Sequence, residues 1–244
     1  MVDGRNGKLK TEKNGGRIKM KKVAVICRGT SLDYIDELPE MDLYILVNRF
    51  GHELEVPKVK KTLEGKEIYH VMSRVGPEPL LMIERGHYKK FDIKKMIQPY
   101  TKHMGDPNSG NSYLYKEIDG ERFFFGGKQI PAFLLGDHHI EHMHNYQSRY
   151  PHHYPSSGNA GFAYGTLDTD ATDVYLIGMD FYENTDKFYY ADDPASGFSP
   201  EDCARMKESI LNIVSKFPEK NFTIYTCGNV ETDLENCKVI KVGG

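Results

Sequence analysis

Residues 27–32, with the sequence CRGTSL, combine residue types that can bind a phosphate. They follow the apolar run KVAVIC (22–27) and precede the helical pattern LDYIDEL, so we expect a strand, a turn and a helix. Gly29 permits a close backbone approach, Thr30 and Ser31 offer donors, and the start of a helix favours an anion. The same turn is also typical of an ordinary strand-to-helix connection, and it lacks the glycine patterns of dinucleotide-binding folds and P-loops.

A second concentration of reactive side chains is a histidine cluster: six of the ten histidines lie between residues 138 and 153. If this stretch is helical, His138 and His142 lie one turn apart and can bind a divalent metal with Asp137 or Glu141. The sequence HHIEH does not match the HExxH motif of zinc proteases. A solvated histidine-rich helix and a catalytic or acceptor-binding histidine are the alternatives.

The other possible metal ligands have simpler explanations. Residues 168–170 (DTD) match the DxD pattern that holds a metal in many nucleotide-sugar transferases, but they stand where a helix-to-strand turn is expected. The four cysteines have no CxxC spacing, so we expect reduced thiols and neither disulfides nor a zinc cluster. They are Cys27, Cys203, Cys227 and Cys237.

The composition excludes several classes of protein. The chain has 244 residues, of which 39% are hydrophobic and 27% charged. It has a mean hydropathy of −0.57 and lacks the apolar run of about 18 residues that a membrane-spanning helix needs. It also lacks the apolar stretch of about 7–15 residues of a secretory signal. We therefore expect a cytoplasmic protein with no integral membrane segment.

Charge is distributed unevenly along the chain. Eight basic and two acidic residues give residues 1–22 a net charge of +6, which leaves −9 on the other 222. We expect residues 1–19 to be a disordered basic leader, with Met20 as a second plausible start, and residues 20–244 to form a single domain. Because the body is acidic, we expect no nucleic-acid partner.

The hydrophobic pattern predicts an α/β fold with a mainly parallel central sheet flanked by helices, because helical stretches lead repeatedly into short buried strands. We expect helices over 78–100, interrupted at Gly86, from Ser156 or Ser157 onward, and over 199–216. Residues 105–112 have loop composition. Further strands are expected at 42–47, 67–73, 121–125, 130–135, 173–178, 221–227 and 237–242.

Two blocks of the chain resemble the bacterial sialyltransferases of glycosyltransferase family 42. The block VAVICRGTSLDYIDELPEMDLYILVNRF is similar to the family's first strand, its Gly-Asn-Gly-Pro-Ser-Leu turn and a second strand ending in Cys-Asn-Gln-Phe. The block from residue 155 (PSSG) through a small-residue helix to DVYLIGMDFYEN is similar to the family's Thr-Ser-Gly, helix and EIYLSGIDFYQN segment. The intervening hundred or so residues and the C-terminal tail show no match.

The resemblance implies a Rossmann-like nucleotide-binding fold, similar to a variant of the GT-A fold, and transfer of a sugar from a CMP-activated donor to a glycan acceptor. It implies no metal or other cofactor, and a homo-oligomer is left open. Tyr182 matches a tyrosine that supports the leaving phosphate. The residues placed around the nucleotide are Arg28, Gly29, Thr30, Ser31, Asn48, Ser156, Ser157, Gly158, Gly178 and Asp180.

The chain departs from the family at three places. Arg28 replaces the asparagine of the turn, which changes hydrogen bonding at the phosphate and would supply positive charge there. Tyr154 replaces the arginine that grips the sialic acid carboxylate, with Arg149 as the nearest alternative. The family's general base is a histidine after the DFY motif, and this chain has no histidine after His153. Candidate bases are Asp192, Asp193 and His153.

Two other functions remain open. A similar glycine turn occurs in archaeal pterin pyrophosphokinase-like proteins, which would imply a metal-dependent transferase acting on a small heterocycle. A nucleotide-binding module without catalysis is the third possibility. The nucleotide site requires that the turn at Gly29 and the serine pair 156–157 meet at the same anionic ligand.

Overall fold

The computed structural model describes residues 21–72, 82, 85–99, 113–118, 121–126, 139–143, 156–182 and 198–243. For residues 98, 99 and the strands between 113 and 143, the description concerns the backbone. The basic leader and the elements expected at 105–112 and 130–135 lie outside the described residues. No helix in these ranges is long and apolar enough to cross a membrane.

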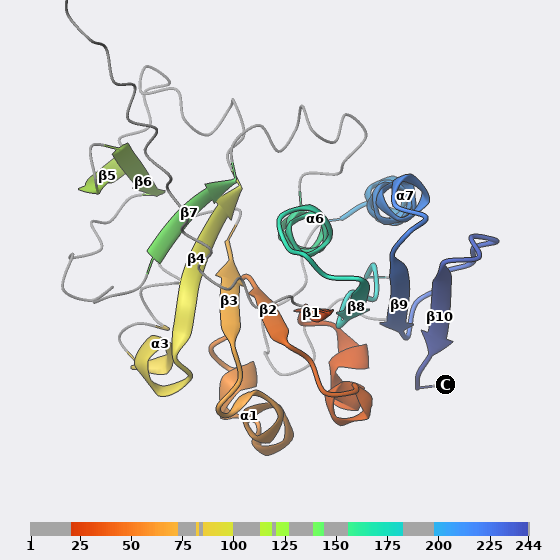
Figure 1. Cartoon of the computed structure of the whole chain (residues 1–244), viewed down its shortest axis with the longest axis horizontal. Coiled ribbons are helices and arrows are strands. Elements are labelled where there is room, and N and C mark those ends of the chain that lie inside the picture. Colours follow the sequence, from red (N-terminus) through yellow and green to blue (C-terminus); the bar gives the residue numbers. More distant parts are fainter. Residues whose placement is uncertain are drawn as a thin grey trace, which may run out of the picture.

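The described strands form an α/β architecture around one eight-stranded sheet (Figure 1). The sheet order is β10-β9-β8-β1-β2-β3-β4-β7, and every neighbouring pair is parallel. The expected mainly parallel sheet is thus confirmed. Two further strands, β5 (Tyr113–Ile118) and β6 (Glu121–Gly126), pair antiparallel. The sheet strands are β1 (Lys22–Ile26), β2 (Leu43–Val47), β3 (Ile68–Val71), β4 (Ile93–Pro99), β7 (His139–Met143), β8 (Asp173–Ile177), β9 (Asn221–Thr226) and β10 (Cys237–Lys241).

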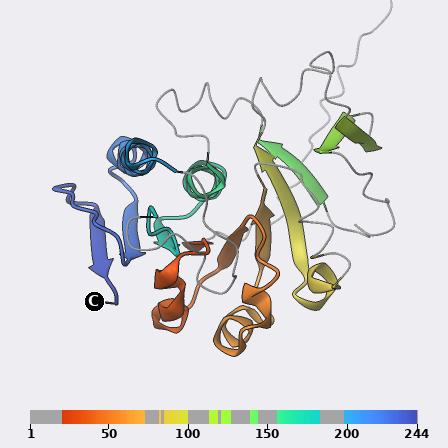
Figure 2. The ribbon, with the colours of Figure 1, turned by 180° about the vertical axis from the view of Figure 1, so that it is seen from behind.

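Helices cover both faces of the sheet (Figures 1 and 2). The α-helices α6 (Ser157–Leu167) and α7 (Pro200–Lys216) pack on one face, with a core that includes the inward residues of β1, β2, β8 and β9. A second core lies on the other face. The elements there are the 3-10 helices η1 (Thr30–Glu37) and η2 (Glu53–Glu55) and the α-helices α1 (Pro57–Leu63) and α3 (His87–Lys90).

The order of strands reverses between β1 and β8. From β1 the chain moves outward through β2, β3, β4 and β7, and then returns to place β8 on the other side of β1. From β8 it continues outward to β9 and β10. Open parallel sheets bind ligands outside the carboxyl ends of their strands at such a reversal, so the fold directs attention to the ends of β1 and β8.

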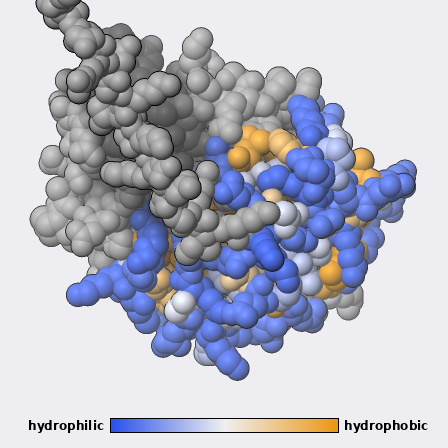
Figure 3. Space-filling view, in the orientation of Figure 1, coloured by the Kyte–Doolittle hydropathy of each residue, from blue (hydrophilic) through white to orange (hydrophobic). Residues whose placement is uncertain are grey.

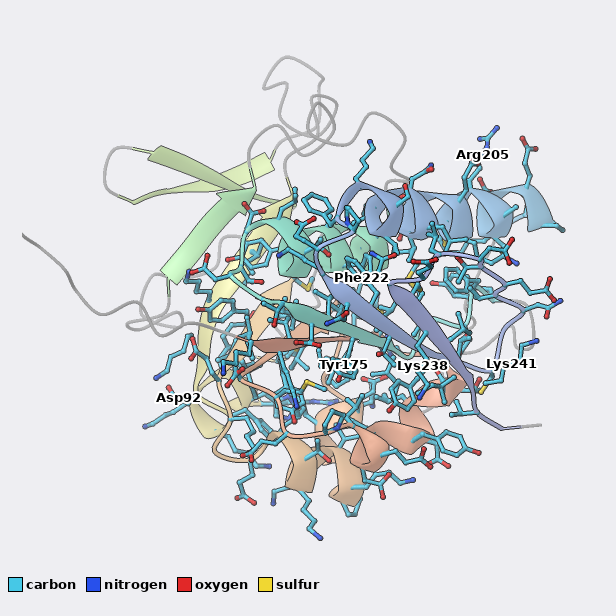
Figure 4. All side chains as sticks on the ribbon, turned by 45° about the vertical axis from the view of Figure 1, so that its right-hand side comes forward. Asp92, Tyr175, Arg205, Phe222, Lys238 and Lys241 are labelled. Atoms are coloured by element: carbon cyan, nitrogen blue, oxygen red, sulfur yellow. The ribbon has the colours of Figure 1, made fainter. Side chains whose placement is uncertain are left out.

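The caps of the two long helices agree with the sequence. Ser156 is the N-cap of α6, and its Oγ accepts a hydrogen bond from the Asn159 amide. Ser199 and Asp202 form a capping box at the start of α7, where Pro200 takes the first position. Figure 4 shows Arg205 on the outer side of α7 and Phe222, from β9, on its inner side. Residues 168–170 form a bend after α6, as their turn signal predicts.

The helix expected over 78–100 is wrong for its second half, because residues 93–99 form strand β4. Ile93, Met96 and Ile97 have the i, i+3, i+4 spacing of a helix face. A register shift opposite Ile68 and Tyr69 puts Ile93 and Met96 into one core, while Ile97 enters the other. A strand that is buried on both faces can therefore imitate helical periodicity.

The helical interpretation of the histidine cluster is also wrong where the structure describes it. Residues His139–Met143 form strand β7, which pairs with β4 at the edge of the sheet. Side chains alternate between the two faces of a strand, so the one-turn spacing proposed for His138 and His142 does not apply. His138 and Asp137 themselves lie outside the described residues.

Helix α6 packs closely on the sheet because glycines face the strands. A Cβ atom on Gly161 would lie 2.9 Å from Val47 Cγ2 and 3.2 Å from Val25 Cγ1. At Gly165 the nearest atoms are 3.3 Å away. Every residue from Ser157 to Thr166 is buried.

The described part of the molecular surface that Figure 3 shows is mainly hydrophilic.

We expect Gly161→Val to lower the free energy of unfolding by about 2 kcal/mol, because the larger side chain overpacks the interface with Val25 and Val47. Denaturant unfolding measures this change. Gly165→Ala is the matched control and should change stability by less than about 1 kcal/mol, since its looser contacts are offset by a better helix propensity. Equal effects of the two substitutions would contradict the close approach at Gly161.

Candidate functional site

The site is built from three segments that meet at the carboxyl ends of β1 and β8. The Gly29 amide donates a hydrogen bond of 2.6 Å to the Gly178 carbonyl, which joins the turn after β1 to the turn after β8. A Cβ atom on Gly158, at the start of α6, would lie 3.0 Å from Met179 Sδ and 3.4 Å from Cys27 Sγ. The structure thus brings the Gly29 turn and the serine pair of α6 to the same end of the sheet.

Asp180 holds the turns of three strands together. Its side chain is buried, and Oδ2 accepts hydrogen bonds from the Ser31 amide at 2.7 Å and from Thr30 Oγ1 at 3.1 Å. Oδ1 accepts from the Cys227 amide at 2.8 Å and from Thr226 Oγ1 at 3.2 Å. The two oxygens therefore tie the turn after β8 to the start of η1 and to the end of β9. Asp180 therefore fixes the relative positions of the turns that form the site.

The turns held together by Asp180 form a junction, and close backbone contact there requires glycine at positions 29 and 178. A Cβ atom on Gly29 would lie 2.4 Å from Asp180 Oδ2 and 2.7 Å from the Gly178 carbonyl oxygen. Gly178 has a φ of +75°, and its Cβ would lie 2.2 Å from the Cys27 carbonyl oxygen. The Gly178 amide donates to Ser31 Oγ at 2.9 Å, so the Ser31 hydroxyl and amide both serve the junction. These positions form the base of the site.

The start of α6 offers donors to an anion. The amides of Ser157 and Gly158 are the first two of an eleven-residue helix, and helix geometry gives them no acceptor within α6. The Ser156 hydroxyl caps the Asn159 amide at 3.1 Å, while Asn159 Nδ2 donates to the Met206 carbonyl of α7 at 3.0 Å. Asn159 thus fixes the start of α6 against α7. A helix N-terminus held in this way favours negative charge.

Arg28 does not direct its side chain into solvent, contrary to the free positive charge expected from the sequence. It is 4% exposed, and its Nε donates a hydrogen bond of 2.6 Å to Oε1 of the fully buried Glu53. Burial raises the pKa of Glu53, and the neighbouring Arg28 opposes that rise. The sequence analysis missed Glu53, although a buried arginine requires a partner of opposite charge.

Asn48 forms the corner that ends β2. Its φ of 61° is left-handed, and its carbonyl accepts hydrogen bonds from the Phe50 amide at 2.9 Å and from His70 Nε2 at 2.5 Å. His70 is fully buried, and its Nδ1 lies 2.5 Å from the Tyr88 hydroxyl. Burial lowers the pKa of His70 to about 4 and raises that of Tyr88. His70, which the sequence analysis also missed, is therefore neutral at pH 7.

A strained corner follows Asp180. Phe181 and Tyr182 have φ values of 54° and 57°, a conformation that costs on the order of 1 kcal/mol or more for residues other than glycine. Phe181 is buried, and the ring of Tyr182 stacks on Phe198 with centroids 4.7 Å apart. This corner sets the position of Tyr182 at the end of β8.

Other expected functional groups are partly outside the described residues. His153, Asp192, Asp193, Tyr154 and Arg149 all lie there. Among the described residues, no group of three or more His, Cys, Asp or Glu side chains could hold a metal ion. Cys27 is buried beside the site, and burial together with Asp180 raises the pKa of its thiol, so it is not an activated nucleophile.

Comparison with known proteins does not assign a family to the chain. No protein-family model, no curated protein and no solved structure matches it.

We expect Asp180→Asn to lower the free energy of unfolding by about 2–4 kcal/mol, because one carboxylate oxygen becomes an NH₂ group that faces donors. Urea unfolding measures the loss. Asp233→Asn, on the exposed segment before β10, is the matched control and should leave stability within about 0.5 kcal/mol of the wild type. Similar stabilities of both variants would show that Asp180 does not hold the junction.

His70 makes the folding stability sensitive to acid. Its pKa in the folded protein, about 4, lies below its ordinary value of 6.5, so the unfolded chain binds more protons between these pH values. The stabilising contribution is present above pH 6.5 and decreases as the pH falls toward 4. From pH 7 to pH 4.5, the loss from this group is about 2 kcal/mol.

We expect His70→Gln to remove this part of the pH dependence. The free energy of unfolding of the variant should fall about 2 kcal/mol less than that of the wild type between pH 7 and pH 4.5. His52→Gln, at an exposed histidine, is the control and should follow the wild-type profile. Parallel profiles for His70→Gln and the wild type would refute the neutral, buried state of His70.

Proposed function

We propose that this protein binds a nucleotide phosphate at the ends of β1 and β8 and is a glycosyltransferase that uses a CMP-activated sugar. The observation that carries the proposal is the meeting of the α6 N-terminus with the Gly29 turn at the reversal of strand order. The α6 N-terminus favours an anion, and parallel sheets bind ligands at this position. The Gly29 turn supplies the close backbone approach but not the donors expected from the sequence, because its Gly29 amide, Ser31 amide and Thr30 hydroxyl bind Gly178 and Asp180. The two sequence blocks that resemble family 42 sialyltransferases supply these same segments.

The charged side chains near the site are already paired, so we expect the helix dipole to attract the phosphate. Arg28 is already paired with Glu53, and the carboxylate of Asp180 is satisfied by four donors. The N-terminus of α6 lies beside Cys27 and Met179, and its dipole favours negative charge there. A phosphate bound there gains from the helix dipole without having to break the Asp180 junction.

The proposed reaction is an inverting sugar transfer. The bond between the anomeric carbon and the phosphate oxygen breaks, CMP leaves with the electron pair, and an acceptor hydroxyl forms the new bond to the same carbon. Tyr182 would donate a hydrogen bond to the departing phosphate, which stabilises the charge that develops in the transition state. The proton of the acceptor hydroxyl goes to a general base, for which Asp192, Asp193 and His153 are the candidates.

We expect CMP to bind without a divalent metal and Ser156→Asp to weaken that binding about tenfold. Aspartate is also a good N-cap, so α6 remains formed, but its charge repels a phosphate at the same helix end. Isothermal titration calorimetry with CMP, CDP, CTP and ATP, each with and without Mg²⁺, measures the affinities. Ser199→Asp at the N-cap of α7 is the matched control and should leave CMP affinity unchanged.

The same titrations distinguish the alternative functions. Tight binding of ATP only with Mg²⁺ would favour a pyrophosphokinase-like enzyme over the glycosyltransferase. CMP binding without hydrolysis of CMP-sialic acid, in the wild type and with Tyr182→Phe alike, would indicate a binding module. Equal CMP affinities of Ser156→Asp and the wild type would refute the phosphate position at α6.

A further inference from the structure

A buried hydrogen-bonded chain connects α3 to the corner of β2. His70 lies near the carboxyl end of β3, with Asn48 on one side of its imidazole ring and Tyr88 on the other. Both His70 and Tyr88 are at most 2% exposed. Tyr88 belongs to the core on the face of the sheet opposite α6. Neither His70 nor Tyr88 is among the residues assigned to the nucleotide, whereas Asn48 is.

The partners determine the protonation state of the imidazole. A backbone carbonyl only accepts hydrogen bonds, so the contact between Nε2 and the Asn48 oxygen requires a proton on Nε2. In the neutral ring, Nδ1 is then an acceptor, and the Tyr88 hydroxyl donates to it. The Asn48 carbonyl thus selects the tautomer, and the Tyr88 hydroxyl satisfies the ring nitrogen that carries no proton.

Asn48 is the residue that gains from this support. Its left-handed backbone is uncommon for a residue other than glycine, although asparagine adopts it more readily than most, and the corner is held by hydrogen bonds on both sides. Three bonds hold it: the Asn48 amide donates to the Val71 carbonyl at 2.9 Å, and the Asn48 carbonyl accepts from Phe50 and His70. Because β2 pairs in register with β1, this corner lies beside the turn that begins at Arg28.

We propose that His70 is a positioning residue, which fixes the Asn48 corner through its Nε2 proton and so sets how tightly the site binds its nucleotide. This inference rests on the proposed function for its effect on affinity. Its effect on the corner does not depend on the ligand. Tyr88 acts one step further away, by holding the imidazole ring of His70 through its Nδ1 atom.

Three variants test the proposal. His70→Phe keeps a flat ring but removes the donor, and should weaken CMP binding at least fivefold. His70→Gln places an amide NH₂ near the position of Nε2 and should restore the affinity to within twofold of the wild type. Tyr88→Phe keeps the imidazole but removes the hydroxyl that holds the ring through Nδ1, and should give an intermediate affinity. A merely structural role would change the melting temperature of these variants without this order of affinities.

A second measurement needs no ligand. Amide hydrogen exchange should be at least tenfold faster at Asn48 and Phe50 in His70→Phe than in the wild type or in His70→Gln, relative to a core amide such as Val25. Exchange at wild-type rates in His70→Phe would overturn the proposal. If the wild type binds no nucleotide, the proposed function fails, while exchange still decides the role of His70. If His70→Phe does not fold, Tyr88→Phe takes its place in both measurements.

Discussion

The site depends on the hydrogen bonds that the buried carboxylate of Asp180 accepts. A charge in this position is costly unless it is fully hydrogen-bonded, and four donors from two other turns meet that requirement. The same four bonds fix the ends of β1, β8 and β9 relative to one another. Gly29 and Gly178 are a consequence of this geometry, since any larger residue would separate the two turns. The polar side chains of the junction therefore bind one another and fix the backbone at the base of the site.

Close packing of α6 completes that surface. Its glycines let the helix axis approach β1 and β2, and Asn159 fixes its first turn to α7. The N-terminal end of α6 consequently lies beside Cys27 and Met179, at the reversal of strand order. Helix approach, strand order and the glycine junction are three separate constraints, and all of them lead to the same end of the sheet. This agreement is the physical basis for the proposed ligand position.

The opposite face of the sheet supports the site with polar groups that are buried. Arg28, in the turn after β1, pairs with Glu53. His70 binds the corner of β2 and is itself bound by Tyr88. Both arrangements leave charged or polar atoms away from water, which is costly in stability and is offset by specific partners. They hold the Arg28 side chain and the Asn48 carbonyl in place. The order of the loops at the site therefore originates in part from residues that no ligand on the α6 side contacts.

The sequence by itself determined the parallel α/β architecture, the helix start at Ser199 and the strands that carry the site, because these follow from local propensity and from the period of burial. It placed the cap of α6 at Ser156 or Ser157, and the structure decided for Ser156. The spacing of apolar residues led to a wrong prediction at β4, where a helix was expected. Apolar residues of this strand enter both cores, and a register shift gives them the spacing of a helix face. Only the tertiary structure decided the partners of Asp180, Arg28 and His70. The bond between Asp180 and Ser31 joins residues 149 positions apart, and Glu53 and Tyr88 carry no local signal of their roles. Hydrophobic patterning records which face of an element is buried, whereas a hydrogen-bond partner is set by distances that exist only once the chain has folded.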